Sequence, residues 1–304
     1  MRFAVVFPGQ GSQFAGMADP WISHPAGKSV IEEASEALGR DLGSGCHDEN
    51  LLATTEFVQP ALLACGLAAF AVLESEGVGG WVGAAGHSLG ELAAFVAAGA
   101  CSLGDIVGVV AVRGRAMQRA ADERAGAMIA LLGDGASHAA AICNEASGGE
   151  VLVVANENSP GQVVISGDEG AVERAVQACR ARGVRTIRLN VAGAFHSPLM
   201  QPAVAALGEA IDGIEFRTPT MPVASNVTGA LVTDPQELRA LSKRQIVSTV
   251  LWNDCMGALS ASGADAFVEA GPGDVLTKLA KRIVPGARAV SVASPGAAAA
   301  LVHG

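Results

Sequence analysis

The first hydrophobic run of the chain predicts a buried β-strand. Residues Phe3–Phe7 are all apolar, and the Pro8-Gly9 pair ends the run. An unbroken apolar run of this length is typical of a parallel strand that is covered on both faces. Further on, the glycine-rich segment Gly77–Gly86 leads into an apolar helix, so we expect a strand, a sharp turn and a helix in that order.

Several longer segments repeat apolar residues at the 3.6-residue period of a helix. Pro60 fits the first turn of the earliest of these helices, where its missing N–H is harmless. The predicted helices are Val58–Glu76, Leu89–Ala98 and Leu103–Ala121, and the segments predicted to be mostly helical are Ser197–Asp212, Arg239–Ser262 and Val275–Ile283. A short buried strand is expected at Ala266–Glu269, and the alanine-rich end from Pro295 onward is expected to fray.

A different pattern begins at Gly126 and has the order β-α-β-β-α-β, which is the signature of a ferredoxin-like unit. Its elements are Ala127–Leu132, Ala139–Ala146, Val151–Ala155, Gln162–Ser166, Glu169–Arg182 and Thr186–Val191. We therefore expect an α/β protein with a small ferredoxin-like insert at residues 126–191. Residues 1–125 and 192–304 would form the larger domain around a mostly parallel sheet.

Composition agrees with α/β packing and excludes some classes of partner. Half of the 304 residues are apolar, and the formal charge of -10 argues against nucleic-acid binding. We find no uninterrupted bilayer-spanning run and no signal peptide, so we expect a cytoplasmic protein that does not bind membranes.

The six cysteines show no metal-ligand spacing, so we expect them to be buried, reduced thiols and expect no metal site. They are Cys46, Cys65, Cys101, Cys143, Cys179 and Cys255.

Two glycine motifs look like phosphate loops but lack required residues. Residues 8–13 read PGQGSQ, yet Phe14 stands where a dinucleotide fingerprint needs its third glycine. The segment Gly27-Lys28-Ser29 ends like a Walker A motif, but Ile22 occupies the place of the first glycine. Neither segment is expected to bind phosphate.

The strongest chemical signal is the sequence GHSLG at residues 86–90. A GxSxG motif between a strand and a helix forms a strained turn that presents the serine hydroxyl above the sheet. The helix that follows points its first backbone amides toward the serine, where they can stabilise a negatively charged acyl oxygen. We therefore interpret Ser88 as a nucleophile rather than as part of a structural turn.

A serine nucleophile needs a base, and His196 is the best placed of six histidines. It lies in the segment GAFHSP at residues 193–198, at a loop-to-helix junction among small residues that would let a substrate approach. His87 is in the turn itself, so its ring must project differently from Ser88. His24, His47, His138 and His303 lie in loops, polar segments or the tail.

Arg113 is the third candidate residue. It interrupts an apolar helix face, and the i±4 positions hold Val109 and Met117, neither of which can pair with it. Two alternatives follow: a distant carboxylate pairs with Arg113, or the substrate brings the carboxylate. Arg115 lies on roughly the opposite side of the helix and is interpreted as a surface charge.

Together these motifs resemble the malonyl-CoA:acyl-carrier-protein transacylases over nearly the whole chain. The matching residues are Phe7–Gln13, Gln59-Pro60, Gly86–Glu91, Arg113-Gly114, Gly126–Met128, Asn158, Pro160–Gln162, Ile165–Gly167, Gly193–Ser197, Asn226–Thr228, Gln245 and Glu269–Gly273. The resemblance implies a hydrolase-like α/β core that carries the ferredoxin-like insert.

The resemblance also implies roles for individual residues. Ser88 would attack the malonyl thioester, and His196 would take its proton while the main-chain carbonyl of Gln245 orients the ring. The backbone amides of Gln10 and Leu89 would form the oxyanion hole. The segment PGQGSQ would then be a turn that brings the Gln10 amide to the thioester oxygen. Arg113 would bind the malonyl carboxylate by a bidentate pair. The substrate site would be completed by Gln10, Met117, Asn158 and Phe195. A phenylalanine beside the histidine is the form of this motif that is selective for malonyl groups.

The reaction implied is ping-pong transfer of malonyl from malonyl-CoA, through Ser88, to the phosphopantetheine thiol of an acyl carrier protein, without a cofactor. A monomer is expected. The acidic carrier would dock on a local basic patch, formed by Lys278, Lys281 and Arg282 or by Arg180, Arg182 and Arg185.

Type II fatty-acid synthesis is the expected pathway, and other functions stay open. Polyketide synthesis and malonate decarboxylation use the same transfer. A thioesterase or lipase would pass the acyl group to water, although Arg113 would have no purpose in a lipase. A catalytically idle scaffold subunit that binds the carrier protein is the last alternative.

Overall fold

A computed structural model describes residues 1–303 of the chain and shows an α/β protein with two sheets. The larger sheet has the order β10-β9-β1-β2-β7-β8, and all neighbouring pairs are parallel except β7 with β8. Its strands are β1 (Phe3–Phe7), β2 (Trp81–Gly86), β7 (Val223–Ala224), β8 (Leu231–Val232), β9 (Ala266–Ala270) and β10 (Arg288–Val292). The predicted fold class is confirmed.

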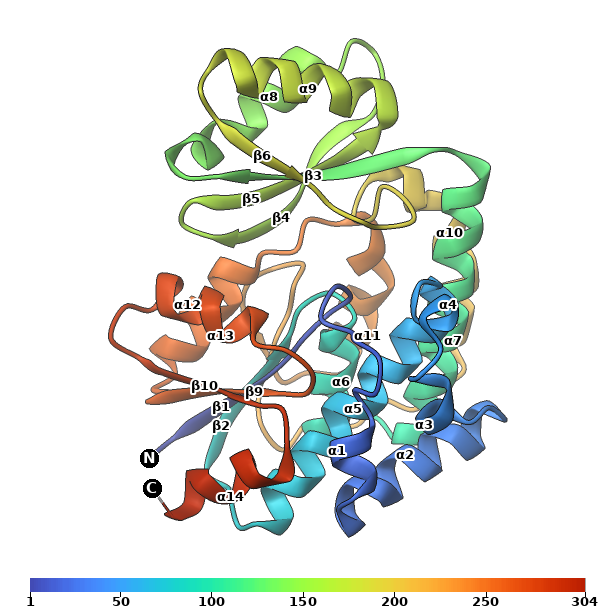
Figure 1. The fold of residues 1–304 in the computed structure, drawn as a ribbon, viewed down its shortest axis with the longest axis vertical. Helices are drawn as coiled ribbons and strands as arrows, with labels where there is room; N and C mark the ends of the chain where they lie inside the picture. Colours follow the sequence, from blue (N-terminus) through green and yellow to red (C-terminus); the bar gives the residue numbers. More distant parts are fainter. Residues whose placement is uncertain (304) are drawn as a thin grey trace.

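Helices cover both faces of the larger sheet (Figure 1). Because side chains alternate along a strand, Val5 and Phe7 of β1 pack on the side of α5 and α6, whereas Ala4 and Val6 pack on the side of α12 and α13. These helices are α5 (Thr55–Ser75), α6 (Gly90–Ala97), α12 (Trp252–Ala261) and α13 (Val275–Ile283).

The remaining helices on this sheet complete its outer layers. They are α1 (Asp19–Ile22), α2 (Pro25–Leu38), α3 (Leu42–Gly45), α4 (Glu49–Leu52), α7 (Leu103–Glu123), α10 (Gln201–Asp212), α11 (Pro235–Arg244) and α14 (Pro295–His303), with short 3-10 turns at η2 (Pro198–Met200) and η3 (Gln245–Val247).

The second sheet is antiparallel, with the order β4-β5-β3-β6. Its elements are β3 (Gly126–Leu132), η1 (Asp134–His138), α8 (Ala139–Ala146), β4 (Leu152–Ser159), β5 (Gln162–Asp168), α9 (Glu169–Ala181) and β6 (Arg185–Arg188). Figure 1 shows α8 and α9 on the outer side of this sheet and the larger sheet below it. Ile129 and Leu131 pack under these two helices, whereas Met128 and Ala130 face the other way, into a cavity between the two sheets.

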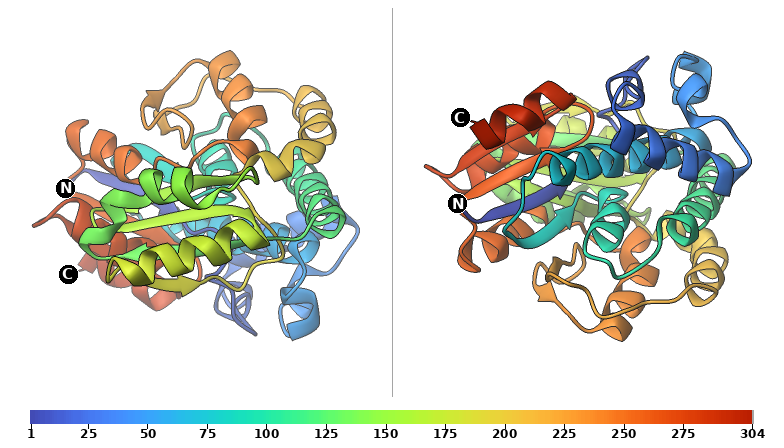
Figure 2. Two further views of the ribbon diagram at one scale, coloured as in Figure 1. Left: turned by 90° about the horizontal axis from the view of Figure 1, so that it is seen from above. Right: turned by 90° about the horizontal axis from the view of Figure 1, so that it is seen from below.

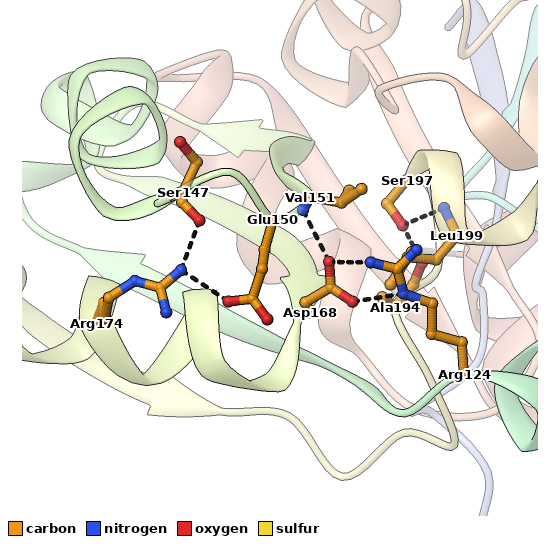
Figure 3. A network of polar contacts seen from close by, with 9 residues as sticks. All are labelled: Arg124, Ser147, Glu150, Val151, Asp168, Arg174, Ala194, Ser197 and Leu199. Carbon is orange, nitrogen blue, oxygen red and sulfur yellow. Dashed lines mark hydrogen bonds and ion pairs between the residues drawn. The ribbon is translucent and has the colours of Figure 1, made fainter.

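An ion pair and close packing hold the smaller sheet to the end of α7. Arg124, which caps α7, donates two hydrogen bonds of 2.7 Å to the carboxylate of Asp168 at the end of β5 (Figure 3). The same carboxylate accepts the Val151 amide at 2.8 Å. The returning chain crosses close by, since a Cβ on Gly126 would lie only 2.7 Å from the Cβ of Ala194. We name the ion pair between Arg124 and Asp168 the Arg124–Asp168 pair.

The helix α5 is long and apolar enough to cross a membrane by composition alone, but 89% of its most apolar window is buried inside the protein. It therefore serves as the central core helix, and Figure 2 shows it from below, packed across the sheet. The helix begins at Thr55, so the prediction that Pro60 lies in its first turn is wrong. Pro60 cannot make one backbone hydrogen bond of the helix, and burial of the helix on every side offsets this loss.

Residues 239–262 are mostly helical, as predicted, but they do not form one helix, because residues 248–251 are extended between η3 and α12. In this segment Val250 donates to the Ala155 carbonyl at 2.8 Å and accepts from the Glu157 amide at 2.9 Å. Pairing with β4 thus overrides the local helical pattern. The prediction that the alanine-rich end frays is wrong for the described residues, because Pro295–His303 form α14, whose Ala298 is buried; Gly304 lies outside the described residues.

Candidate active site

Ser88 lies in a strained turn between β2 and α6, above the carboxyl ends of β1 and β2. Its φ is +52°, and His196, with φ of +58°, is the other non-glycine residue with a positive φ among residues 1–303. The flanking glycines are required by space, because a Cβ on Gly86 would lie 1.8 Å from the Gly90 carbonyl carbon and one on Gly90 2.1 Å from the Phe7 oxygen. Strain at two residues that touch each other is typical of a functional site.

The hydroxyl of Ser88 lies 2.7 Å from Nε2 of His196. On the other side of the ring, Nδ1 lies 3.1 Å from the carbonyl oxygens of both Gln245 and Ser248. Carbonyls can only accept, so Nδ1 carries the proton and Nε2 is free to accept the serine proton. Burial, with the nearby charge of Arg113, lowers the pKa of His196 to about 3, which keeps the ring neutral.

The structure places the carbonyl of Gln245 where the sequence comparison expected it and adds a second carbonyl, that of Ser248. Sequence reasoning missed this residue because a main-chain acceptor leaves no signal in side-chain chemistry. The direction of the Ser248 carbonyl is fixed by the extended segment 248–251 after η3, which no local sequence pattern indicated.

Arg113 is 1% exposed and reaches the reacting group itself. Its Nη2 donates to the Ser88 hydroxyl at 3.0 Å and to Oε1 of Gln245 at 3.1 Å, and its Nη1 donates to Oε1 of Gln59 at 2.8 Å. Burial lowers its pKa to about 10, so the guanidinium remains charged at neutral pH.

Within residues 1–303, Arg113 forms no ion pair, and its buried Nε has no hydrogen-bond partner. A charged group in this state is costly unless something further binds it. Of the two alternatives from the sequence, this arrangement favours a carboxylate supplied by the substrate.

The loop Pro8–Gln13 packs directly against the serine turn. A Cβ on Gly9 would lie 2.5 Å from the carbonyl oxygen of His87, so only glycine fits there. The Ser12 hydroxyl donates to the Gly9 carbonyl at 2.8 Å, and the Gln13 side chain accepts the Gly11 amide at 2.7 Å, so both side chains stabilise the turn. Among the described residues, the backbone amides of Gln10 and Leu89 have no acceptor, which leaves both available to an incoming oxyanion.

A cavity of about 220 Å³ between the two sheets brings most of the predicted residues together. Eight of the nine site residues expected from the sequence line it: Gln10, Ser88, Leu89, Arg113, Met117, Asn158, Phe195 and His196. Gln245 lies behind the cavity, in contact with Ser88 and Arg113. His87 does not act as the base, because its Nε2 is taken by Oδ1 of Asn158 at 2.8 Å.

Three buried polar residues near Ser88 have roles that the sequence did not predict. Asn226 accepts the Ser88 amide at 2.7 Å and donates to the Gly86 carbonyl at 2.8 Å, so it holds both ends of the serine turn. Gln59 contacts Arg113, and Glu91, which is 2% exposed, contacts Gln245. The signal that could have found them is a polar residue at a position expected to be buried, because such a residue must be hydrogen-bonded to a specific partner.

The two predicted basic clusters lie in different places. Lys278, Lys281 and Arg282 are exposed on α13, whose apolar residues Val275, Leu276 and Leu279 line the cavity that holds Ser88. Lys278 is paired with Asp274 at 2.7 Å. Arg182 and Arg185 line a separate surface pocket on the smaller sheet, next to Arg180 in the chain, and Arg182 is paired with Glu145. The six cysteines are buried and unpaired.

Comparison with known proteins agrees with this geometry. The acyl transferase domain family matches residues 4–302. The malonyl CoA-acyl carrier protein transacylase of Escherichia coli K12 is 42% identical over 308 residues, covering 99% of each chain. The crystal structure of malonyl-CoA:acyl carrier protein transacylase (FabD) from Xanthomonas oryzae is 40% identical, with a TM-score of 0.95 over 100% of this chain and 99% of that one.

A second solved structure shows a type II polyketide acyl carrier protein in complex with its malonyl-transacylase, PlMCAT. It is 38% identical to this chain, with a TM-score of 0.94 over 98% of each. Full-length matches at this identity establish the family. This chain is a member of the acyl transferase domain family and is similar to the malonyl-CoA:acyl carrier protein transacylases.

Proposed function

We propose that the protein transfers the malonyl group of malonyl-CoA to the phosphopantetheine thiol of an acyl carrier protein. The observation that carries this proposal is the buried guanidinium of Arg113, which lies 3.0 Å from the hydroxyl of Ser88. A permanent cation beside the nucleophile suits an acyl group that ends in a carboxylate. The full-length similarity to malonyl transacylases supports the same activity.

The first half-reaction loads the enzyme. His196 accepts the Ser88 proton at Nε2 as Ser88 Oγ attacks the thioester carbon, and the Gln10 and Leu89 amides bind the oxyanion that forms. Collapse of the tetrahedral intermediate breaks the C–S bond, and His196 returns the proton to the leaving thiolate of coenzyme A. A malonyl ester remains on Ser88, with its carboxylate bound by Arg113.

The second half-reaction uses the same groups in reverse. His196 takes the proton of the phosphopantetheine thiol, whose sulfur attacks the malonyl ester. The ester C–O bond then breaks, Ser88 regains its proton from His196, and malonyl leaves on the carrier protein. No step needs a cofactor or a metal ion.

Three further points belong to this proposal. Residues 126–191 form the small ferredoxin-like domain, with 1–125 and 192–304 as the large domain, and the separate hydrophobic cluster under α8 and α9 supports this division. The enzyme acts as a cytoplasmic monomer in type II fatty-acid synthesis, with polyketide or malonate metabolism as the alternative.

The carrier protein docks on the basic residues of α13 rather than on the arginines near α9. Of these two clusters, the one on α13 borders the cavity that holds Ser88, whereas Arg182 and Arg185 line a separate pocket.

The test is intact mass after brief mixing with malonyl-CoA, for the wild type and for Ser88→Ala, followed by a chase with holo carrier protein or with buffer. We expect a malonyl adduct on the wild type alone, cleared by carrier protein and persistent in buffer. Equally fast clearance in buffer would instead indicate a thioesterase. No adduct on the wild type would contradict malonyl transfer.

A further inference from the structure

Glu91 is a buried carboxylate that the reaction described above does not use. It lies in the first turn of α6, three residues after Ser88, and is 2% exposed. Burial raises its pKa to about 7, while the hydrogen bonds to it act in the opposite direction. An acidic side chain is retained in the interior only where specific partners offset the loss of hydration.

The partners of Glu91 connect it to the substrate-binding cation. Its Oε1 accepts the backbone amide of Asn226 at 2.9 Å, and its Oε2 accepts Nε2 of the Gln245 side chain. The same Nε2 also donates to the Ser88 carbonyl at 2.8 Å, while Oε1 of Gln245 accepts Nη2 of Arg113 at 3.1 Å. The Gln245 amide thus has its donor end toward Glu91 and its acceptor end toward Arg113.

A side-chain amide can rotate by half a turn and exchange its two ends, so something must select one orientation. Carbonyl and carboxylate oxygens can only accept, and Glu91 with the Ser88 carbonyl therefore selects the orientation in which Nε2 faces them. In the other orientation, an NH₂ group would face the guanidinium of Arg113. Two donors would then meet in a buried site.

We propose that Glu91 is a positioning residue, which fixes the Gln245 amide and through it the guanidinium of Arg113 in the place where the acyl carboxylate binds. This role rests on the proposed malonyl transfer. Glu91 touches neither the substrate nor the reacting atoms, so it acts on the selection and binding of the acyl group more than on the attack by Ser88.

The substitution Glu91→Gln separates this role from simple loss of charge. Both oxygens of Glu91 are used as acceptors, and a glutamine has one oxygen. Because the Asn226 amide is fixed in the backbone, the oxygen of the introduced side chain is expected to remain there and its NH₂ group to meet Gln245. Only the Ser88 carbonyl then still favours the original orientation of the Gln245 amide, so we expect the Gln245 side chain to turn and release Arg113.

The readout is the rate of acylation of Ser88, followed by intact mass at increasing concentrations of malonyl-CoA or acetyl-CoA. For Glu91→Gln we expect the half-saturating concentration of malonyl-CoA to rise roughly tenfold, because an oriented charge-assisted contact is lost. The maximal rate should fall less than about threefold, and acylation by acetyl-CoA should change less than about twofold. Loss of negative charge alone would lower the half-saturating concentration of malonyl-CoA, since Arg113 would bind the carboxylate without competition.

A double-mutant cycle tests the link to Arg113. In an Arg113→Ala background, adding Glu91→Gln should change malonylation less than about twofold, because the group that Glu91 positions is gone. Glu269→Gln is the matched control: Glu269 is also buried and uses both oxygens as acceptors, but its partners are the amides of Leu276 and Thr277. Any loss in that control should fall equally on malonyl-CoA and acetyl-CoA.

Several results would overturn the role of Glu91. An equal loss with both acyl groups, a lower half-saturating concentration of malonyl-CoA, or an additive loss in the Arg113→Ala background would each do so. If Glu91→Gln does not fold, Glu91→Asp keeps the acidic group but is too short to accept from both the Asn226 amide and the Gln245 side chain. A malonyl-selective defect there supports the proposal, and an equal loss with both acyl groups overturns it.

The wild type separates this proposal from the proposed function. A wild-type chain that forms no malonyl adduct overturns malonyl transfer and the role of Glu91 together. A wild type that malonylates normally, with no malonyl-selective defect in Glu91→Gln, overturns the role of Glu91 alone.

Discussion

At the scale of single residues, Arg113 is central because it contacts the nucleophile and has a free buried donor. Arg113→Ala should lower kcat/KM for malonyl-CoA by about tenfold to a hundredfold, which corresponds to a charge-assisted hydrogen bond of about 1.5–3 kcal/mol. Acetyl-CoA, which has no carboxylate to bind, should not lose activity.

The control for Arg113 is its neighbour Arg115, which is half exposed and lies 3.6 Å from Glu56. Steady-state kinetics on Arg115→Ala should match the wild type with both substrates. Equal losses for malonyl-CoA and acetyl-CoA in Arg113→Ala would contradict selection by the guanidinium.

The pKa of His196 predicts the pH dependence of the first half-reaction. Because burial lowers this pKa from 6.5 to about 3, the base stays neutral across pH 5–8, and its protonation should not reduce the acylation rate in that range. An acidic limb near pH 7 that disappears in Glu91→Gln would instead belong to Glu91, whose pKa is raised to about 7. Acylation rates of both proteins at each pH decide between the two groups.

The same shift predicts the sign of a stability effect. Folding holds His196 neutral, so the folded protein binds fewer protons than the unfolded chain between pH 6.5 and about 3. The contribution of this residue is fully present above pH 6.5 and is lost as the pH falls toward 3. Urea unfolding of wild type and His196→Gln at pH 7 and pH 5 should show the wild type losing more stability on acidification.

At the scale of elements, the Arg124–Asp168 pair joins the end of α7 to the smaller sheet. The Asp168 side chain is 8% exposed, whereas Arg124 is 55% exposed, so solvent screens the charge but the buried carboxylate still accepts three hydrogen bonds. Asp168→Ala should therefore lower the free energy of unfolding by about 1–3 kcal/mol, measured by urea denaturation.

Hydrogen exchange gives this prediction its spatial test. Amides of β4 and β5 should lose more protection than those of β1 in Asp168→Ala, because the altered carboxylate holds the smaller sheet. Glu215→Ala is the control, since its ion pair with Arg217 is exposed on both sides and should contribute nothing measurable. Uniform loss of protection would show that the pair has no local role.

Most elements could be predicted because their apolar period was clear. The limits of β3, α8 and α13 agree with the sequence to within one residue. The failures have tertiary causes: the extended residues 248–251 are set by pairing with β4, and the strands β7 and β8 are only two residues long. No local pattern contains such information.

The same division applies to the site. Ser88, His196 and Arg113 could be proposed because each carries chemistry that its surroundings make unusual. Glu91, Asn226 and the carbonyl of Ser248 act by holding other groups, so their roles become visible only when distances are known.

At the scale of the whole molecule, an enzyme of formal charge -10 must attract an acidic carrier protein with a local field. Reversing the charge of Lys281 and Arg282 on α13 should raise the KM for carrier protein several-fold, more strongly at low salt, and leave acylation by malonyl-CoA unchanged. Reversing Arg180 and Arg185 makes the same change in net charge away from the cavity. If both pairs of substitutions raise this KM equally, α13 is not the docking surface.

The order of the strands in the larger sheet has a consequence for synthesis on the ribosome. The strand β1 is made first, but one of its two neighbours, β9, begins at Ala266 and is followed by β10 at the sheet edge. A nascent chain therefore presents a bare, fully apolar strand edge until almost the last residue has left the exit tunnel. Chains that end between residues 197 and 262 should be retained by chaperones or degraded, even though both residues of the serine–histidine pair have already been translated.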